Sequence, residues 1–438
     1  MREDRKVVIT GMGTVTAYGI GIAPYSDGLR FGSTTASLIS SFDPGTLPTR
    51  FAGNLHIDEE GLEQYLEKPK AAKTMSRPGK FAMIAAQEAV KQSGINFSGI
   101  DPYRVGITLG AGGLGVWDPA HAEISADILL QSILRDGDDL SLDQRGLLMR
   151  SLQKIHPLSP LKALPNIPTA HIAIHFNIRG SSGTVTTACT SSAQAIGDAY
   201  RQIKFGLAEV MLSGGADSMI NPNGVVAFSA LGVLSKNNDE YLTASRPFDK
   251  RRDGFMIGEG AAIFVLEEME HARKRGADIL AEVAGFGTAC DAYRLTDEPP
   301  DAHGSIRSME NALHDAEISP DKVQYINAHG TGTRINDRTE TFAIKKVFGS
   351  GSSLIPPCSS TKSMLGHLVA AAGAVELAAC TIAMRENFLP PTINYEVPDP
   401  ECDLDYIPNS AREYRADTIL SNSFGFGGQN ASLILRKV

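Results

Sequence analysis

The stretch Gly183–Tyr200 reads GTVTTACTSSAQAIGDAY, and our interpretation of the fold depends on its change of local pattern. Its β-branched beginning predicts a strand, and the small residues after Cys189 predict a closely packed helix. Cys189 lies at the junction, where exposed N–H groups and the helix dipole favour a thiolate. The local pattern leaves equally open that Cys189 is a small buried hydrophobic residue. The other four cysteines lack this setting.

Short apolar runs that end in glycine-rich turns occur twice in the same order along the chain. The four pairs of segments begin at Val7 and Ala281, Val105 and Val323, Val185 and Ser359, and Val210 and Ile419. This duplication predicts two related α/β halves, residues 1–270 and 271–438, with mainly parallel, helix-covered sheets. Residues 117–160 break the pattern. They are helical in character and charged, which predicts a surface cap or insertion on the first half.

Two of the ten histidines lie in glycine-bounded turns: His329 precedes GTGT, and His367 follows KSMLG and begins a helix. A loop histidine is more often an ordinary polar residue, but the duplication places both at strand ends like that of Cys189. Such ends converge on functional sites in α/β folds. A helix N-terminus predicts a neutral, hydrogen-bond-donating His367. Lys362 adds a nearby positive charge. Glu376 is either its buried counter-charge or a solvated helix residue, and its apolar neighbours favour the first.

The last glycine cluster, NSFGFGG at residues 422–428, combines backbone freedom with two aromatic rings. Such a loop can present an N–H group to an oxyanion and swing a ring as a gate. The alternative is a plain tight turn with phenylalanines in the core.

Composition excludes several classes of function. The formal net charge of -9 argues against nucleic acid as a partner. Five widely spaced cysteines predict neither a disulfide framework nor a metal site, and favour a reducing cytoplasm. No secretory signal is expected, and residues 369–384 predict a core helix rather than a membrane span because Glu376 interrupts them. A dinucleotide site is disfavoured because no glycine loop forms a complete GxGxxG turn followed by an acidic residue.

Five motifs resemble those of the elongating β-ketoacyl-acyl-carrier-protein synthases, which have the thiolase fold. They are TACTS at 187–191, RPFDKRRDG at 246–254, NAHGTGT at 327–333, KSMLGH at 362–367 and NSFGFGG at 422–428. The resemblance covers essentially the whole chain and is weakest over residues 117–160. It implies a duplicated, five-layered αβαβα fold, acyl-carrier protein as a partner, and a homodimer or a heterodimer with a related chain-length-factor subunit.

The same resemblance implies a decarboxylative condensation with malonyl-acyl-carrier protein. Cys189 would carry the acyl group, His329 and His367 would form the catalytic pair, and Lys362 and Glu376 would support them. The N–H groups of Cys189 and Phe426 would form the oxyanion hole, and Phe426 would also act as the gate. Neither a metal nor a dissociable cofactor is implied, because substrates arrive on the carrier's phosphopantetheine arm.

Further residues are assigned by the same resemblance. Gly112 and Gly113 stand where relatives place an isoleucine, which predicts room for a longer acyl chain beside Phe228. The expected pantetheine contacts are Thr296, Thr331 and Thr333. Arg294 replaces a usual histidine, and TRINDR at 333–338 and DPECDLDY at 399–406 resemble type II polyketide ketosynthases. These departures favour a specialised polyketide pathway slightly over fatty-acid synthesis.

An acidic carrier protein needs a local basic patch on this acidic chain. Lys68, Lys70, Lys73 and Arg77 are candidates, and the alternative is a solvated charged face. Two rival functions share the fold. A non-catalytic chain-length-factor subunit would lack Cys189 and the histidines, and a thiolase-type acyltransferase would arrange its cysteine and histidine motifs differently.

Overall fold

The computed structural model describes residues 5–112, 119–136, 139–349 and 355–438. Its main sheet has eleven strands, of which β2 (Gly19–Ile20) pairs only with β1. The other ten strands follow one hydrogen-bonded path, in the order β13 (Cys358–Ser359), β12 (Tyr325–Asn327), β16 (Thr418–Gly425), β17 (Gln429–Arg436), β11 (Ala281–Cys290), β1 (Val7–Thr16), β10 (Glu259–Glu268), β9 (Val210–Ser218), β5 (Val105–Ala111) and β8 (Ser182–Val185).

The two halves of this path repeat each other, outward from the pairing of β1 with β11. Each half continues with an antiparallel strand, β10 or β17, then a second antiparallel step to β9 or β16. Two parallel strands follow, β5 and β8 or β12 and β13. The four repeated sequence segments lie on equivalent strands, so the expected duplication is confirmed. In each half one strand, β10 or β17, runs against the other four.

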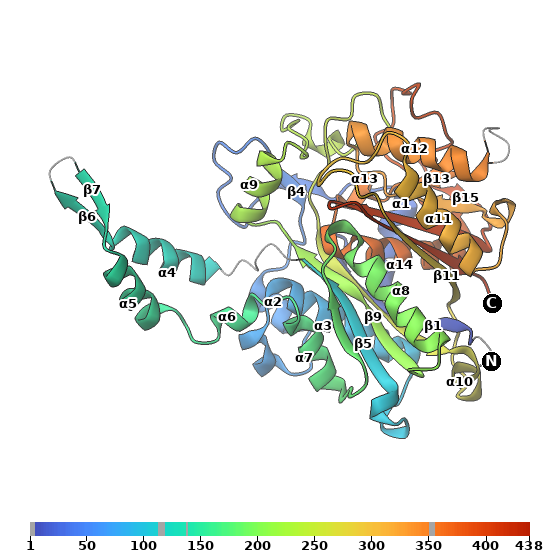
Figure 1. The fold of residues 1–438 in the computed structure, drawn as a ribbon, viewed down its shortest axis with the longest axis horizontal. Helices are drawn as coiled ribbons and strands as arrows, with labels where there is room; N and C mark the ends of the chain where they lie inside the picture. Colours follow the sequence, from blue (N-terminus) through green and yellow to red (C-terminus); the bar gives the residue numbers. More distant parts are fainter. Residues whose placement is uncertain (1–4, 113–118, 137–138, 350–354) are drawn as a thin grey trace.

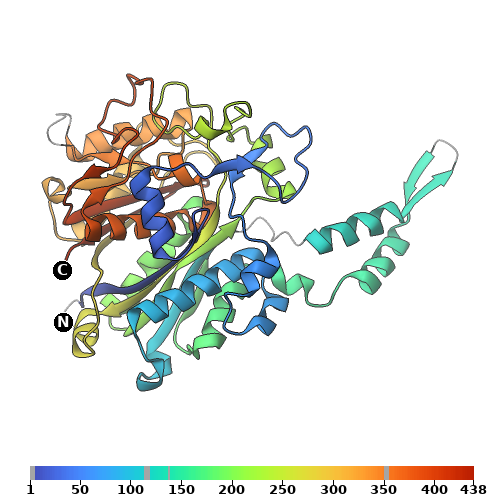
Figure 2. The ribbon, with the colours of Figure 1, turned by 180° about the vertical axis from the view of Figure 1, so that it is seen from behind.

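The two halves of this sheet form separate β layers, and helices cover their outer faces and lie between them, which gives the expected five layers. The central layer contains α8 (Ser191–Lys204) and α14 (Ala372–Glu386), which contact each other and the inner faces of the two halves. On the outer faces lie α3 (Arg77–Ser93) with α7 (Ile167–Phe176), and α11 (His303–Asp315) with α12 (Arg334–Phe348). Figure 2 shows α3 lying across the outer face of the N-terminal half. Figure 1 labels α8 and α14, the two helices of the central layer.

Alternating side chains of each strand enter different cores, as the pleat of a β-strand requires. In β10, Phe264 and Leu266 join the central core between the sheets, whereas Ile263 and Val265 join the outer core under α3. A strand buried on both faces can therefore carry a continuous apolar run without alternation, as residues 261–266 of β10 do.

Residues 119–162 form an arm that projects from the body of the molecule (Figure 1). The arm contains α4 (Pro119–Leu130), the hairpin strands β6 (Ile133–Asp136) and β7 (Asp139–Leu142), α5 (Gln144–Lys154) and α6 (Ser159–Lys162). The arm coincides with the region expected to be an insertion, and it contains a hairpin as well as helices. Its surface carries exposed apolar side chains beside its charged ones. Leu130, Leu148 and Leu152 are 68%, 70% and 80% exposed.

The remaining elements connect these layers. They are α1 (Ile22–Phe31), the paired strands β3 (Ala36–Leu38) and β4 (Phe51–Gly53), α2 (Glu59–Glu63), α9 (Pro222–Ala230), α10 (Met269–Lys274), α13 (Lys362–Leu365) and the paired strands β14 (Phe388–Leu389) and β15 (Arg412–Glu413). The expected boundary after residue 270 falls inside α10. Within the described ranges, no helix has both the length and the apolar character needed to cross a membrane.

Candidate active site

Cys189 lies in a tight turn between β8 and α8. A short 3-10 helix, Ala188–Thr190, makes the turn, and α8 begins at Ser191. The Ser191 hydroxyl fixes it by accepting from the Thr187 N–H at 2.8 Å and donating to the Ala188 carbonyl at 2.7 Å. Ala188 has a φ of 50°, a left-handed conformation that costs a non-glycine residue about 1–3 kcal/mol. The strand–cysteine–helix junction expected from the sequence is thus present.

The second half contains an equivalent turn, which follows His367. A 3-10 helix, Val369–Ala371, precedes α14, and Val369 has a φ of 46°. The backbone of His367 is fixed against the neighbouring segment, because its N–H donates to Met256 and its carbonyl accepts from Gly258. The duplication therefore brings Cys189 and His367 to the same place from equivalent turns of the two halves.

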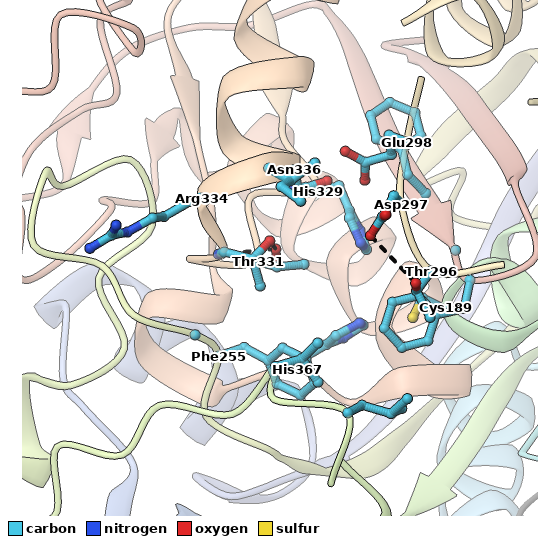
Figure 3. Close-up of a pocket in the computed structure, with 18 of the residues that line it drawn as sticks. Cys189, Phe255, Thr296, Asp297, Glu298, His329, Thr331, Arg334, Asn336 and His367 are labelled. Atoms are coloured by element: carbon cyan, nitrogen blue, oxygen red, sulfur yellow. Dashed lines mark hydrogen bonds between the residues drawn. The ribbon is translucent and has the colours of Figure 1, made fainter. Parts of the chain in front are cut away.

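The Cys189 thiol and the two histidines meet at one cavity of about 380 Å³ (Figure 3). Sγ of Cys189 and one ring nitrogen each of His329 and His367 lie within 4.8 Å of one another. The imidazole centroids are 5.3 Å apart, and the rings are nearly perpendicular at 84°. All three side chains are buried, so their mutual interactions are weakly screened by solvent.

Hydrogen bonds fix the tautomer of both imidazoles. The Val369 N–H donates to Nδ1 of His367 at 3.2 Å, and the Lys362 ammonium, which can only donate, lies 3.4 Å from Nδ1 of His329. Because each Nδ1 is an acceptor, each neutral ring carries its hydrogen on Nε2. Nε2 of His367 is buried and has no hydrogen-bond partner among the described residues. Two N–H donors are thus available at the centre of the cavity.

Both histidines are neutral at physiological pH. Burial lowers the pKa of His329 well below its usual value, and the positive charge of Lys362 and the neighbouring His367 lower it further. Burial, followed by Lys362, likewise lowers the pKa of His367. The sequence predicted a neutral His367 from its place at a helix N-terminus, whereas burial is the larger cause.

Lys362 and Glu376 form a buried ion pair that connects α13 to α14. The Lys362 ammonium also donates to the His329 carbonyl at 2.6 Å, so it fixes the histidine at two atoms. Burial raises the pKa of Glu376 to about 7, although Lys362 opposes the shift. The carboxyl of Glu340 fixes the other side of this turn by accepting from the N–H groups of His329 and Gly330.

The charge state of Cys189 differs from the expectation. Burial raises the pKa of the thiol to about 12, and the charge of Lys362 and a hydrogen bond from the Phe426 N–H offset only part of the shift. The prediction that the helix N-terminus favours a thiolate was therefore wrong. Desolvation of a charged sulfur outweighs the helix dipole here.

The glycine cluster after β16 passes directly beside the cysteine. A Cβ atom on Gly425 would lie 3.3 Å from the Cys189 nitrogen and 3.2 Å from the Thr187 carbonyl oxygen, closer than side chains normally pack. Gly427, with a φ of 86°, turns the chain into β17. The Phe426 N–H donates to the Cys189 sulfur, and the Gly425 backbone lies beside the Cys189 N–H.

The other expected pocket residues divide into two groups. Phe228, Thr296, Thr331 and Thr333 line the cavity with Cys189. Gly112 does not open space there, because a Cβ atom on it would lie 2.7 Å from Asp217 Oδ1 and 2.9 Å from the Met219 methyl group. Gly113 lies outside the described residues.

The four expected docking residues do not share one environment. Lys68, Lys70 and Lys73 are exposed along the short 3-10 helix Pro69–Thr74. Arg77 is engaged instead, because its guanidinium makes two hydrogen bonds of 2.8 Å to the buried Glu259. Arg77 is therefore a structural residue, and only the three lysines remain available for docking.

Several residues of the cavity wall were missed in the sequence. The rings of Phe255 and His367 make a T-shaped contact with centroids 5.2 Å apart, and Glu298, Arg334 and Asn336 line the cavity. For Glu298 the only sequence signal is its place two residues after Thr296. Within the RPFDKRRDG motif, Arg252 has a structural role, because it is buried against Asp337 and Asp399.

Among the described residues, Cys189, His329 and His367 are also the one group of cysteine, histidine and acidic side chains close enough to ligate a metal ion. The Lys362 ammonium lies beside this group, 3.4 Å from His329 Nδ1. A fixed positive charge at this distance disfavours a second cation, so the donors fit an organic substrate better than a metal.

A duplicated αβαβα architecture with a cysteine and two neutral histidines at the junction of its halves defines the thiolase-like class of proteins. Two family models match the sequence: the β-ketoacyl synthase N-terminal domain over residues 4–272 and the β-ketoacyl synthase C-terminal domain over residues 280–396. The chain belongs to the β-ketoacyl synthase family.

Relatives from two kinds of pathway are similar over their full length. The chain is 40% identical to 3-oxoacyl-[acyl-carrier-protein] synthase 2 of Coxiella burnetii, covering 100% of this chain and 99% of that protein. It is also 40% identical to the putative polyketide β-ketoacyl synthase 1 of Streptomyces cyaneus, covering 98% of each. A type II polyketide ketosynthase, solved with its acyl-carrier protein and bound to the hexaketide, has a TM-score of 0.85 at 32% identity, covering 99% of this chain and 100% of that one.

Proposed function

We propose that the chain is an elongating β-ketoacyl-acyl-carrier-protein synthase, which joins an acyl group held on Cys189 to malonyl-acyl-carrier protein. The observation that carries this proposal is the pair of Nε2–H donors beside the thiol. Two neutral imidazoles with acceptor Nδ1 atoms suit hydrogen bonding to a thioester oxygen and stabilise the charge that develops there. A non-catalytic subunit or a thiolase-type acyltransferase does not explain this arrangement together with the family match.

The first half-reaction transfers the acyl group. The sulfur of Cys189 attacks the thioester carbonyl of the acyl-carrier protein, and the new C–S bond forms as the bond to the pantetheine sulfur breaks. The proton of Cys189 ends on the leaving pantetheine thiol. The N–H groups of Cys189 and Phe426 bind the transient oxyanion, each contributing about 3 kcal/mol. The ring of Phe426 lines the cavity and acts as the gate.

The second half-reaction forms the carbon–carbon bond. Malonyl-acyl-carrier protein loses carbon dioxide, and the electron pair of the broken C–C bond becomes the enolate of an acetyl thioester. His329 and His367 donate hydrogen bonds to the enolate oxygen, while Lys362 and Glu376 fix His329. The enolate carbon attacks the acyl carbonyl, and Cys189 leaves as a thiolate that takes a proton from solvent. The reaction uses no separate cofactor.

We infer the pathway from segments that depart from the fatty-acid synthase pattern, and the partners from exposed surfaces of the chain. The TRINDR and DPECDLDY segments support a specialised type II polyketide pathway, with Phe228 in the acyl pocket. Thr296, Thr331 and Thr333 contact the pantetheine arm. We also propose that the boundary between the two halves lies near residue 270 and that the protein is cytoplasmic. All five cysteines are free, which suits a reducing compartment.

A second subunit fits two exposed features. Strand β8 is the edge of the sheet and is partly exposed, so its backbone groups are open to pairing with another strand. The arm carries leucines that nothing in the described chain covers. We assign both features to a dimer interface with an identical or closely related chain.

Intact mass measurement tests the function directly. The protein is exposed to a panel of acyl-carrier proteins loaded with acyl groups of different lengths. We expect the mass of one acyl group to be added to the parent protein and none to the Cys189→Ala variant. Acylation that persists in Cys189→Ala would overturn the assignment, as would transfer from acyl-coenzyme A alone.

A further inference from the structure

Two buried oxygen atoms in the wall of the Cys189 cavity lack a hydrogen-bond partner among the described residues. They are Oε2 of Glu298 and Oδ1 of Asn336. An unpaired buried acceptor is costly, so native proteins leave few of them without a partner or a ligand. Figure 3 shows both side chains at the end of the cavity where His329 lies. The catalytic scheme above uses neither residue.

The surroundings of the two side chains identify the chemistry that they require. The Asn336 amide nitrogen donates to Asp337 at 3.1 Å, which leaves its oxygen as the open group. Burial raises the pKa of Glu298 to about 8, and the neighbouring carboxylates of Glu340 and Asp291 add to the shift. Glu298 is therefore a neutral carboxylic acid at pH 7, which both donates and accepts a hydrogen bond.

An amide matches this pair because it carries one N–H donor and one carbonyl acceptor. An aliphatic chain would leave both oxygen atoms unpaired. A cation has the right charge for acidic neighbours, but a protonated Glu298 would offer it no carboxylate.

We propose that Glu298 and Asn336 form a subsite that binds an amide group of the thioester substrate. The inference rests on the proposed function, since it assumes a thioester in this cavity. The amide has two sources: the pantetheine arm, which passes Thr296 on the same loop, or an acyl chain that itself contains an amide. Glu298 is a positioning residue, because it binds substrate at a distance from the reacting carbonyl.

The experiment compares two small thioesters of one simple acyl group. The N-acetylcysteamine thioester contains an amide of the pantetheine type, and the ethanethiol thioester contains none. Acylation of Cys189 is followed by intact mass in the parent protein and in Glu298→Leu, Glu298→Gln and Asp297→Asn. Asp297 is the matched control, because its carboxyl group lies on the same loop but already pairs with Arg294 at 3.1 Å.

We expect Glu298→Leu to raise the KM of the N-acetylcysteamine thioester roughly fivefold to tenfold, the effect of one lost hydrogen bond. The rate with the ethanethiol thioester should stay within about twofold of the parent. Glu298→Gln keeps a donor and an acceptor and should retain the preference, and Asp297→Asn should also retain it. If Glu298→Leu melts at the assay temperature, Glu298→Ala supports the same comparison.

The outcomes separate the alternatives. Equal losses on both thioesters or equal losses in the Gln and Leu variants would overturn the subsite. An unchanged preference in Glu298→Leu would exclude the arm as the source of the amide. A third thioester, of ethanethiol with an acyl chain that carries its own amide, tests the other source: a loss confined to it would assign the subsite to the acyl group, and no loss on it either would overturn the subsite. A parent protein that is acylated by no thioester would contradict the proposed function itself.

Discussion

At the scale of single residues, Cys189 combines a reactive position with an unreactive charge state. Its backbone is held in a strained turn beside two N–H donors, yet burial keeps the thiol protonated. A thiol in this state resists adventitious alkylation and oxidation, which require the thiolate. In the proposed mechanism the sulfur loses its proton as it attacks the thioester carbonyl, and the proton ends on the leaving pantetheine thiol.

The pH dependence of alkylation follows from this charge state. Below a pKa of about 12 the thiolate fraction rises about tenfold per pH unit. The rate of iodoacetamide alkylation at Cys189 should therefore rise with the same slope from pH 7 to pH 10 without a plateau. Peptide mass mapping resolves this site from the exposed Cys290. A plateau below pH 9 would show that the thiol is not desolvated as described.

Sequence reasoning located the central residues but not the whole cavity wall. Cys189, His329 and His367 each stand in a local pattern that predicts a turn, and the turns converge because the fold is duplicated. Glu298 has no such pattern, and its significance depends on burial against carboxylates distant in sequence. The charge state of Cys189 was mistaken for a related reason, since local sequence shows a helix N-terminus but not the loss of solvent.

At the scale of elements, the Lys362–Glu376 pair joins α13 to α14 and holds the turn of His329. Breaking one partner leaves an uncompensated charge in the interior, which costs about 3–5 kcal/mol. Replacing both partners by apolar residues of similar volume removes that charge and is often close to neutral in stability. The pair thus offers a way to separate the stability of the fold from its catalysis.

Lys362→Met should accordingly lower the free energy of unfolding by about 3–5 kcal/mol. The double variant Lys362→Met with Glu376→Leu should recover most of that loss. Decarboxylation of malonyl-carrier protein should remain impaired in both, because nothing then fixes the Nδ1 tautomer of His329. Urea unfolding and carbon dioxide release measure the two effects. A stable double variant with parental activity would remove Lys362 from the catalytic scheme.

Strands were predictable from the sequence where a repeated apolar segment corresponds to a buried strand. The repeated segments identified β1, β5, β8 and β9 with their partners in the second half. Strands β10 and β17 were not among the repeated segments, so the one reversed strand in each half was missed. The β6–β7 hairpin was also missed, because the surrounding residues were interpreted as helical. The sequence between the two strands is the dipeptide Gly137-Asp138, which is a hairpin signal.

At the scale of the whole molecule, the arm is the part that the isolated chain does not explain. Its exposed leucines are stabilised if a second subunit covers them. The double substitution Leu148→Glu with Leu152→Glu should convert a dimer into monomers without unfolding the body. Gln153→Glu on the same helix is the matched control and should leave the dimer intact. Analytical ultracentrifugation with circular dichroism would contradict the interface if the double variant remained dimeric.

Docking of the carrier protein is a second whole-molecule property. Reversing Lys68 and Lys70 to glutamate should slow acylation by acyl-carrier protein about tenfold or more at low salt, because steering of an acidic partner is lost. Reaction with an N-acetylcysteamine thioester should be unchanged, since a small substrate needs no docking surface. Equal loss on both substrates would indicate damage to the fold rather than to docking.

The central claim is that Cys189 holds the electrophile while His329 and His367 generate the nucleophile. Carbon dioxide release from malonyl-acyl-carrier protein, measured without an acyl donor, tests it most directly. We predict that Cys189→Ala still releases carbon dioxide, whereas His329→Ala and His367→Ala each lose about a hundredfold or more, because each lacks one donor to the enolate oxygen. Release at the parental rate by either histidine variant would contradict the account.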